Sequence, residues 1–276
     1  MSDPTIRLAV LGSPISHSKS PALHRAAYAR LGLDWEYTAV EMDGAGLPGF
    51  LGSRDDSWRG LSLTMPLKQD VLPLLDEIDE LGRLTGAANT VRFDDGARRG
   101  FNTDVGGIVR TLREAGVERM RRGILIGGGA TAASALAAMA ELDAVEATVL
   151  VRRPEAAQRL VELGAALGVD VSTGSVAELE RVAAADLVVS TVPGGTDLGV
   201  AASVALMRRA PLLDVAYSPW PTALAAQWLA AGGTVVHGLG MLLHQALLQV
   251  RIFVSGDPSR ALPDEDDVLA VMRESL

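Results

Sequence analysis

The sequence predicts an α/β protein built from two domains. Its 276 residues suit one large domain or two moderate ones. Short apolar runs alternate with amphipathic stretches, which is the pattern of a mostly parallel sheet with helices on its faces. A glycine-rich turn at residues 127–130 opens a second series of the same kind. Two successive α/β series therefore predict both the fold class and the division of the chain.

The first series occupies about the first hundred residues. Three apolar runs predict strands, at residues 6–11, 35–40 and 60–63, and the last two are each followed by a helix candidate. A helix is expected at residues 21–31, with Ser20 as its N-cap and Pro21 in its first position. Residues 88–93 and 98–101 flank the sequence D-D-G-A, which predicts a hairpin.

The second series continues to the end of the chain. Its strand candidates are residues 123–126, 147–151, 186–190, 212–215 and 234–237. Its helix candidates are residues 105–115, 132–141, 155–163, 241–254 and 263–274. The last of these begins with the acidic run 264–267, which suits the positive end of a helix dipole.

Composition narrows the classes of function. The net charge of −9 and the isoelectric point of about 5.0 argue against nonspecific nucleic-acid binding, which needs a basic face. The chain has no cysteine, which excludes disulfides, thiolate catalysis and cysteine zinc sites. We find no signal-peptide pattern and no uninterrupted apolar run of about 18 residues. We therefore expect a cytoplasmic protein with no nucleic-acid or membrane partner.

The sequence G-G-G-A-T-A follows a strand candidate and opens a helix candidate. As a G-x-G-x-x-A motif it comprises Gly127, Gly129 and Ala132. The first residue permits a tight turn, the second lets a pyrophosphate approach the backbone, and the third lets helix and strand pack closely. The N–H groups at the helix start suit the anion. Glycine-rich turns also serve packing alone, and this alternative stays open.

Two arginines follow the next strand candidate. A dinucleotide-binding domain carries its ribose-binding residue about 20 residues after the glycines. Here that position is Val151, followed by Arg152 and Arg153. An acidic residue would favour an unphosphorylated ribose, whereas guanidinium groups bind a 2′-phosphate in a bidentate fork. The pair predicts NADP rather than NAD, with a solvated charged face as the alternative.

Lys68 and Asp104 are the candidate catalytic pair. Each lies at the end of a strand, in the segments L-S-L-T-M-P-L-K and F-N-T-D. Single lysines are usually surface charges, and Asp104 could simply cap the helix that follows it. A ketone reduction, however, needs a hydride donor, a proton donor and polar groups that orient the carbonyl. A lysine held by an aspartate can supply the proton.

An ordered set of motifs runs over nearly the whole chain. They are G-S-P-I-S-H-S-K-S-P-A-L-H at 12–24, L-T-M-P-L-K at 63–68, G-A-A-N-T at 86–90, N-T-D at 102–104, G-G-G-A at 127–130, V-P at 192–193, D-V-A-Y at 214–217 and G-L-G-M-L-L-H-Q-A at 238–246. In this set the chain resembles shikimate dehydrogenase, the NADP-dependent reductase of 3-dehydroshikimate. The ordered combination is far more specific than any one motif.

The resemblance implies a role for each matching residue. Lys68 matches the catalytic lysine and Asp104 its partner. Independently of the resemblance, the chain has no Cys and only scattered His and Asp, so no metal site is expected. The implied substrate-binding residues are Ser18 and Ser20 for the carboxylate, Thr64 and Asn89 for the ring hydroxyls or carboxylate, Tyr217 near the carboxylate, and Gln245 at the ring. The implied cofactor-binding residues are Gly127, Gly128, Gly129, Ala130, Thr131, Arg152 and Arg153, with Gly238 and Met241 lining the nicotinamide.

The chain departs from the family pattern at a few positions. Many relatives have asparagine where Ser62 stands, so a ring contact would be lost or mediated by water. Glycine is usual at the positions of Val105 and Ala130. Arg153 replaces a hydroxyl that could contact the phosphate. None of these changes removes Lys68 or Asp104.

The resemblance also implies the domain arrangement. An N-terminal α/β substrate domain, residues 1–104, is expected to be completed by the C-terminal helices in 239–276. A Rossmann-type NADP-binding domain is expected at 105–238, with the active site in the cleft between the domains. The implied partner is a small-molecule substrate, and the implied assembly is a monomer or homodimer.

The implied reaction is the reversible reduction of 3-dehydroshikimate to shikimate, in the chorismate route to aromatic amino acids. One alternative is a quinate or shikimate dehydrogenase that uses NAD or has a broader substrate range. Ser62 keeps quinate activity open because it alters the ring pocket. Another alternative, of a different class, is a non-catalytic paralogue that senses NADP or shikimate. Loss of Lys68 or Asp104 would mark such a sensor, and both residues are present.

Overall fold

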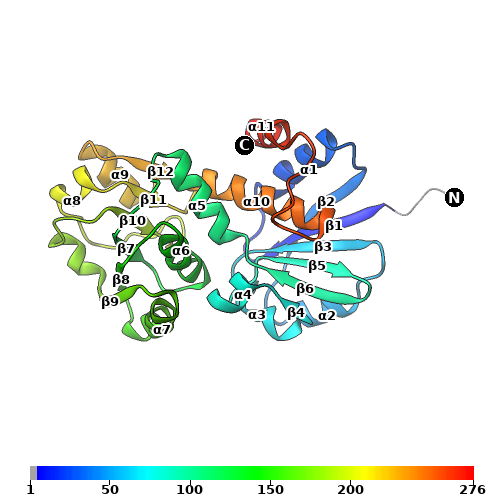
Figure 1. The fold of residues 1–276 in the computed structure, drawn as a ribbon, viewed down its shortest axis with the longest axis horizontal. Coiled ribbons are helices and arrows are strands. Elements are labelled where there is room, and N and C mark those ends of the chain that lie inside the picture. The colour runs from blue at the N-terminus through cyan, green and yellow to red at the C-terminus, as the bar shows by residue number, and fades with distance from the viewer. Residues whose placement is uncertain (1–4) are drawn as a thin grey trace. The chain divides into compact units, whose positions relative to one another are not determined.

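The computed structural model describes residues 5–276. The chain divides into two compact units, called unit 1 (residues up to 103, and 242–276) and unit 2 (residues 104–241). Each unit has its own sheet (Figure 1). Each unit also has its own apolar core. Residues 1–4, part of the segment in which we expect no signal peptide, lie outside the described residues.

Unit 1 is built on a mixed sheet in the order β2-β1-β3-β5-β6-β4. Its strands are β1 (Ile6–Gly12), β2 (Trp35–Glu41), β3 (Trp58–Leu63), β4 (Glu77–Ile78), β5 (Thr90–Asp94) and β6 (Ala97–Phe101). β1 is parallel to β2 and β3, whereas β5 is antiparallel to β3 and β6. The predicted hairpin is confirmed, because Asp95 and Gly96 have the positive φ angles (47° and 85°) of a tight two-residue turn.

The helical elements of unit 1 include one correction to the sequence analysis. They are α1 (Ser20–Arg30), α2 (Leu47–Gly52), α3 (Leu67–Asp70), η1 (Leu72–Leu74), α4 (Glu80–Thr85), α10 (Gly238–Ser255, which begins in unit 2) and α11 (Glu265–Glu274). The expectation that Ser20 caps α1 is wrong. Lys19 is the N-cap, because its carbonyl already accepts the N–H of Leu23 at 3.2 Å and starts the helix one residue earlier.

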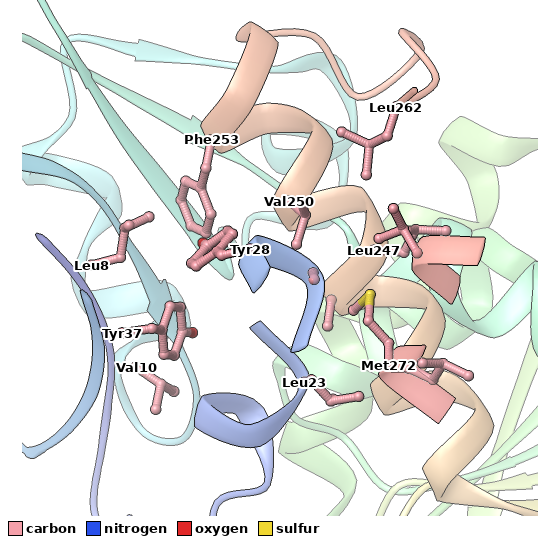
Figure 2. Close-up of a cluster of buried hydrophobic side chains, with 14 of the residues drawn as sticks. Leu8, Val10, Leu23, Tyr28, Tyr37, Leu247, Val250, Phe253, Leu262 and Met272 are labelled. Atoms are coloured by element: carbon pink, nitrogen blue, oxygen red, sulfur yellow. The ribbon is translucent and has the colours of Figure 1, made fainter. Parts of the chain in front are cut away.

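The two faces of this sheet carry different apolar clusters. Leu8 and Val10 point to one face, where they pack with α1, α10 and α11, including the ring of Phe253 (Figure 2). Ala9 and Leu11 point to the other face, which α2 and α3 cover. Successive side chains of a strand alternate between faces, so one apolar strand supplies both clusters. Figure 1 shows these two groups of helices on opposite sides of the strands.

Helix α10 lies close to β3 at Gly60. A Cβ atom at this position would lie 2.6 Å from the Phe253 ring and 2.5 Å from the carbonyl oxygen of Val91. In a close-packed interior, any side chain here would force α10 away from the sheet. Gly60 therefore sets the depth at which α10 packs.

Unit 2 is built on a parallel sheet in the order β12-β11-β10-β7-β8-β9. The strands are β7 (Arg122–Ile126), β8 (Glu146–Val151), β9 (Asp170–Ser175), β10 (Leu187–Ser190), β11 (Leu212–Asp214) and β12 (Val235–His237). Numbered from the first strand of the unit, this is the order 3-2-1-4-5-6 of a Rossmann fold. The predicted α/β class, with a Rossmann-type second half, is confirmed.

The remaining helical elements belong to unit 2. They are α5 (Asp104–Glu114), α6 (Ala130–Glu141), η2 (Pro154–Ala157), α7 (Gln158–Leu167), η3 (Val176–Glu180), α8 (Val204–Arg209) and α9 (Ala223–Ala230). The helix expected at residues 155–163 starts late, because residues 154–157 form a tighter 3-10 turn of the kind common at helix starts. One sheet face packs against η3, α8 and α9 around the buried Trp228.

Within the described residues, α10 is the one helix long and apolar enough, by length and composition, to cross a membrane. Its stretch has a mean hydropathy of 1.2, and 72% of it is buried inside the protein. A core helix passes the same test of length and composition. The burial of α10 against the unit 1 sheet is the simpler account of its apolar character.

His24 is buried in the core of unit 1. Its ring stacks on Tyr37 with centroids 4.0 Å apart, and its Nδ1 lies 2.9 Å from the carbonyl oxygen of Ser20. A carbonyl can only accept, so Nδ1 carries the proton of the neutral ring. Burial lowers the pKa of His24 from 6.5 to about 4, although the Ser20 carbonyl and the Gln249 side chain would favour the protonated ring. The imidazole is therefore neutral at pH 7.

We expect this histidine to weaken the fold in acid. Between pH 6.5 and about 4 the unfolded chain binds a proton at His24 that the folded chain does not, so stability falls as pH falls. About 3 kcal/mol of stability is lost by pH 4, and the loss levels off below that pH. The His24→Asn variant should not show this loss of unfolding free energy in acid. Urea unfolding of the wild type and the variant at half-unit pH steps will measure the loss. If the unfolding free energies of the two proteins fall in parallel with pH, His24 is not its source.

Candidate functional site

The loop after β1 lies at the carboxyl edge of the unit 1 sheet, beside the end of β3. The N–H of Thr64 donates to Leu11 O at 2.9 Å, and the N–H of Ser13 donates to Met65 O at 3.0 Å. Gly12 permits this approach, because a Cβ there would lie 2.3 Å from Thr64 Cγ2. Backbone bonds thus join the first motif to the T-M-P-L-K segment.

The two candidate serines lie at the end of this loop and at the start of α1. The carboxylate of Glu41 accepts from Ser13 Oγ at 2.6 Å and from the N–H of Ile15 at 2.9 Å, which fixes the start of the loop. Ser18 is half-buried, and Ser20 is buried in the first turn of α1. Hydroxyls beside the N-terminus of an 11-residue helix are suited to a carboxylate.

Lys68 is carried on the short helix α3, which is anchored on both sides. Its backbone carbonyl accepts the N–H of Ala88 at 2.8 Å, and the N–H of Leu67 donates to Thr64 O at 2.8 Å. Leu67 is fully buried, whereas Lys68 is half-buried. The backbone of Lys68 is therefore fixed. Its hydrogen bond to Ala88 also places it beside Asn89, the next residue along the chain.

Asn89 is buried in a cluster with Thr103 and Gln245. Its Oδ1 accepts the N–H of Thr103 at 2.9 Å, and its Nδ2 donates to Thr103 Oγ1 at 2.8 Å and to Gln245 Oε1 at 3.3 Å. A backbone N–H can only donate, so this contact decides which side of the amide carries the oxygen. The structure thus brings together two of the candidate substrate residues, Asn89 and Gln245.

The hydroxyl of Ser62 is engaged inside the protein. It accepts from Tyr37 Oη at 2.7 Å and donates to Gln249 Oε1 at 2.8 Å, in a site that leaves Ser62 only 3% exposed. Its one proton is thereby committed, and any bound ring would meet only its remaining lone pair. That the usual ring contact is altered at this position remains a prediction.

Three residues of this cluster were not found by sequence reasoning: Tyr37, Thr103 and Gln249. Gln249 had a readable signal, because it follows Gln245 by one helical turn and is a polar residue in a mostly apolar helix. Thr103 belongs to the N-T-D motif but had no assigned role. The sequence around Tyr37 predicts only a strand, with no sign of a polar role for the tyrosine.

The glycine loop of unit 2 lies at the point where the strand order reverses. The N–H of Thr191, after β10, donates to Ile126 O at 2.8 Å, which pairs the ends of β7 and β10. Gly127 has a φ of +121°, and a Cβ there would lie 2.3 Å from Thr191 Oγ1. Ligands of open parallel sheets bind at such a switch point.

The start of α6 is suited to an anion. Its N-cap is Gly129, which has no side chain to cap the first N–H groups, and a Cβ there would meet nothing within 4 Å. Ala132 is fully buried, as the close-packing position of the motif requires. The loop therefore offers both open space and backbone donors at the helix N-terminus.

Arg152 and Arg153 follow β8, one strand away from this loop. Both are exposed, and neither forms an ion pair within the described part of the chain. Their guanidinium groups are therefore available to an anionic ligand at the carboxyl edge of the unit 2 sheet.

The other candidate residues also lie in unit 2. Asp104 is buried and is itself the first residue of α5, rather than a cap before it. Burial raises the pKa of the Tyr217 phenol, which is half-buried. Gly238 begins α10, where a Cβ would lie 2.3 Å from Val215 O, and Met241 is buried.

A separate surface pocket of about 970 Å³ lies at the opposite edge of the unit 2 sheet. It is lined at the start of β7 by Arg122 and includes Asp143 and Asp186. These carboxylates are already bound, Asp143 to Arg119 and Asp186 to the N–H of Arg122. No cluster of metal-binding side chains occurs among the described residues.

Comparison with known proteins decides the family. The chain is 34% identical over 257 residues to the shikimate dehydrogenase (NADP(+)) of Methanothermobacter thermautotrophicus, covering 90% of this chain and 91% of that one. The chain belongs to the shikimate dehydrogenase family. The family model of the shikimate dehydrogenase substrate binding domain matches residues 10–91.

Solved shikimate dehydrogenases share the fold over their full length. The enzyme of Mycobacterium tuberculosis is 38% identical, with a TM-score of 0.85, and the match covers 98% of this chain and 99% of that one. The enzyme of Thermus thermophilus, in complex with NADP(H) and shikimate, is 30% identical, with a TM-score of 0.80 and coverage of 99% and 100%.

Gly127 and Gly129 of the glycine loop should tolerate substitution by alanine to different degrees. Gly127→Ala would place a methyl group against Thr191 in a left-handed backbone, so we expect a loss of about 1–3 kcal/mol of unfolding free energy. Gly129→Ala has open space and a φ of −91°, so its loss should stay below about 1 kcal/mol. Denaturant unfolding will compare them, and equal losses would refute the steric account of Gly127.

Proposed function

We propose that the protein interconverts 3-dehydroshikimate and shikimate with NADP as cofactor, in the chorismate route to aromatic amino acids. The observation that carries this proposal is the cluster of Asn89, Thr103 and Gln245 at the carboxyl edge of the unit 1 sheet. Amide and hydroxyl groups fixed in a buried site suit a small ring with several hydroxyls. The Thermus relative, which holds NADP(H) and shikimate together, supports the same conclusion.

In this proposal unit 1 binds the substrate and unit 2 binds NADP. The hydroxyls of Ser18 and Ser20 hold the substrate carboxylate, with Tyr217 near it. Thr64, Asn89 and Gln245 bind the ring oxygens. The protein works in the cytoplasm, as a monomer or homodimer, on a small-molecule substrate.

The scarcity of lysine supports a chemical role for Lys68. The chain has only two lysines, Lys19 and Lys68, although lysine and arginine together number 25. Lys19 Nζ donates to the carbonyl oxygen of Leu276 at 2.9 Å, so its role is in docking the C-terminus. An arginine cannot release its proton in a protein, whereas a lysine can donate and accept one. Lys68 is therefore proposed to exchange a proton with the substrate oxygen. Asp104 is proposed to orient both the lysine and the substrate hydroxyl.

The residues of unit 2 fit NADP. The N-terminus of α6 and the open side of Gly129 would hold the pyrophosphate, together with Gly127, Gly128, Ala130 and Thr131. Arg152 and Arg153 would hold the 2′-phosphate. Gly238 and Met241 would line the nicotinamide. When bound, the reduced cofactor supplies the hydride.

The assay that tests this function offers shikimate and quinate, each with NADP and with NAD, and follows the absorbance of reduced nicotinamide. We expect the fastest turnover with shikimate and NADP. Arg152→Ala with Arg153→Ala should raise the KM for NADP at least about tenfold and leave the KM for NAD unchanged, because only the phosphate contact is lost.

The exposed Arg181 of the same unit is the matched control, and Arg181→Ala should leave both KM values unchanged. Equal or faster turnover with quinate, or a preference for NAD, would assign the protein to the alternative dehydrogenase. NADP binding without turnover of any pair would support the sensor.

Lys68→Ala should lower kcat by at least about 10²-fold while the affinity for shikimate changes little, because a positioned acid or base contributes about 10²–10⁴-fold. Lys68→Arg keeps the positive charge but removes proton exchange, so it should be nearly as slow. Initial rates and calorimetric binding of shikimate measure the two effects. An active arginine variant would reduce the role of Lys68 to that of a charge.

A further inference from the structure

One row of α10 side chains faces the unit 1 sheet. Gln245, Gln249 and Phe253 are spaced four residues apart and therefore lie on the same side of the helix. Phe253 reaches the sheet at Gly60, and Gln245 contacts Asn89 at the carboxyl edge. Gln249 lies between them along the helix. Its surroundings are entirely buried, and only 2% of its surface is exposed.

The amide of Gln249 is fully hydrogen-bonded. Its Oε1 accepts from Ser62 Oγ at 2.8 Å, and its Nε2 donates to Asn89 O at 3.0 Å and to Thr90 Oγ1 at 3.1 Å. The backbone carbonyl of Asn89 can only accept, so Nε2 must face β5 and Oε1 must face β3. Ser62 is then obliged to donate its proton to Gln249.

The same amide also decides the direction of the Thr90 hydroxyl. Because Gln249 donates to Thr90 Oγ1, the proton of Thr90 is directed to Asn89 Oδ1 at 3.0 Å. Asn89 Oδ1 thus receives two donors, Thr90 and the N–H of Thr103. The Nδ2 group, on the other side of the amide, donates to Thr103 Oγ1 at 2.8 Å and to Gln245 Oε1 at 3.3 Å.

We propose that Gln249 is a positioning residue for substrate recognition, which acts together with the N–H of Thr103 to hold the Asn89 amide, and which sets the proton of Ser62, without touching the substrate itself. The inference rests on the proposed function for the identity of the ligand, but the orientation of the amides can be tested without it. Gln249 holds the Asn89 backbone directly and the Asn89 amide through Thr90, in the orientation in which Nδ2 donates to Thr103 and Gln245 of the proposed substrate cluster. It also leaves Ser62 able only to accept.

A purely structural role would give a different pattern of effects. Removing buried hydrogen bonds lowers stability wherever it is done, so a fall in melting temperature alone says nothing about positioning. A positioning role adds a selective loss of substrate affinity, with the affinity for NADP unchanged. It also adds a loosened Asn89 side-chain amide.

The test compares Gln249→Met with Thr90→Val and with a matched control, all in the full chain. Methionine keeps the length of glutamine but cannot hydrogen-bond, and valine keeps the shape of threonine without its hydroxyl. The control is Gln227→Met in unit 2, where Gln227 likewise bridges two backbone groups, Val200 O and the N–H of Ala202, each at 3.0 Å.

We expect Gln249→Met to raise the KM and dissociation constant for shikimate on the order of tenfold, with the KM for NADP within about twofold. Thr90→Val should act in the same direction with a smaller effect. The double variant should be no worse than Gln249→Met alone, because Thr90 acts on Asn89 through the same path. Gln227→Met should lower the melting temperature and leave the KM for shikimate unchanged.

A second readout is independent of the substrate. In ¹⁵N-labelled protein the Asn89 side-chain NH₂ should exchange slowly with solvent, and faster in Gln249→Met than in Gln227→Met. Unchanged exchange in Gln249→Met would overturn the proposal whatever the activity. Altered exchange in a protein that neither binds nor turns over shikimate would retain the positioning role and refute the proposed function.

Discussion

The contact between α10 and β3 at Gly60 is the constraint on which the rest of unit 1 depends. Because Gly60 has no side chain, the ring of Phe253 lies directly against the strand and the helix packs at a fixed depth. At that depth Gln249, one turn earlier, reaches Ser62 of β3 and Thr90 of β5, and Gln245, two turns earlier, reaches Asn89 just before β5. The apolar core and the candidate substrate site are therefore parts of one packing arrangement, and neither can shift without the other.

Unit 2 depends on a glycine in a related way. Gly127 allows β7 to end against Thr191 at the switch point of a parallel sheet, and the chain then turns directly into α6. The helix N-terminus is left with open space in front of it at Gly129. In both units, then, a missing side chain creates a site that backbone and amide groups line.

Much of this fold could be predicted from local patterns. The apolar strands 6–11 and 123–126 and the Asp95–Gly96 hairpin carry strong signals of periodicity and turn chemistry. The strand β9 was missed because D-V-S-T-G-S is polar and lies at the sheet edge, pairing only with β8. Helices α8 and α9 were missed because six and eight residues show too little helical periodicity.

The candidate site was predicted unevenly, for a physical reason. Residues within contiguous motifs, such as Lys68 and Asn89, were identified through the family resemblance, whereas spacing alone left Lys68 as an ordinary charge. Gln249 and Tyr37 were missed because each meets Ser62 only in the folded chain, across 187 and 25 positions of sequence. No local pattern encodes such a contact.

The amide at position 249 contributes direction as well as hydrogen bonds. A buried amide left without partners costs about 1–3 kcal/mol, whereas each hydrogen bond that the Gln249 amide makes contributes about 0.5–1.5 kcal/mol. What an amide adds is direction, because its oxygen and nitrogen face opposite sides. Hydroxyls rotate, and Gln249 stops the rotation at Ser62 and Thr90. Such local departures from an apolar pattern are expected where a sequence serves function.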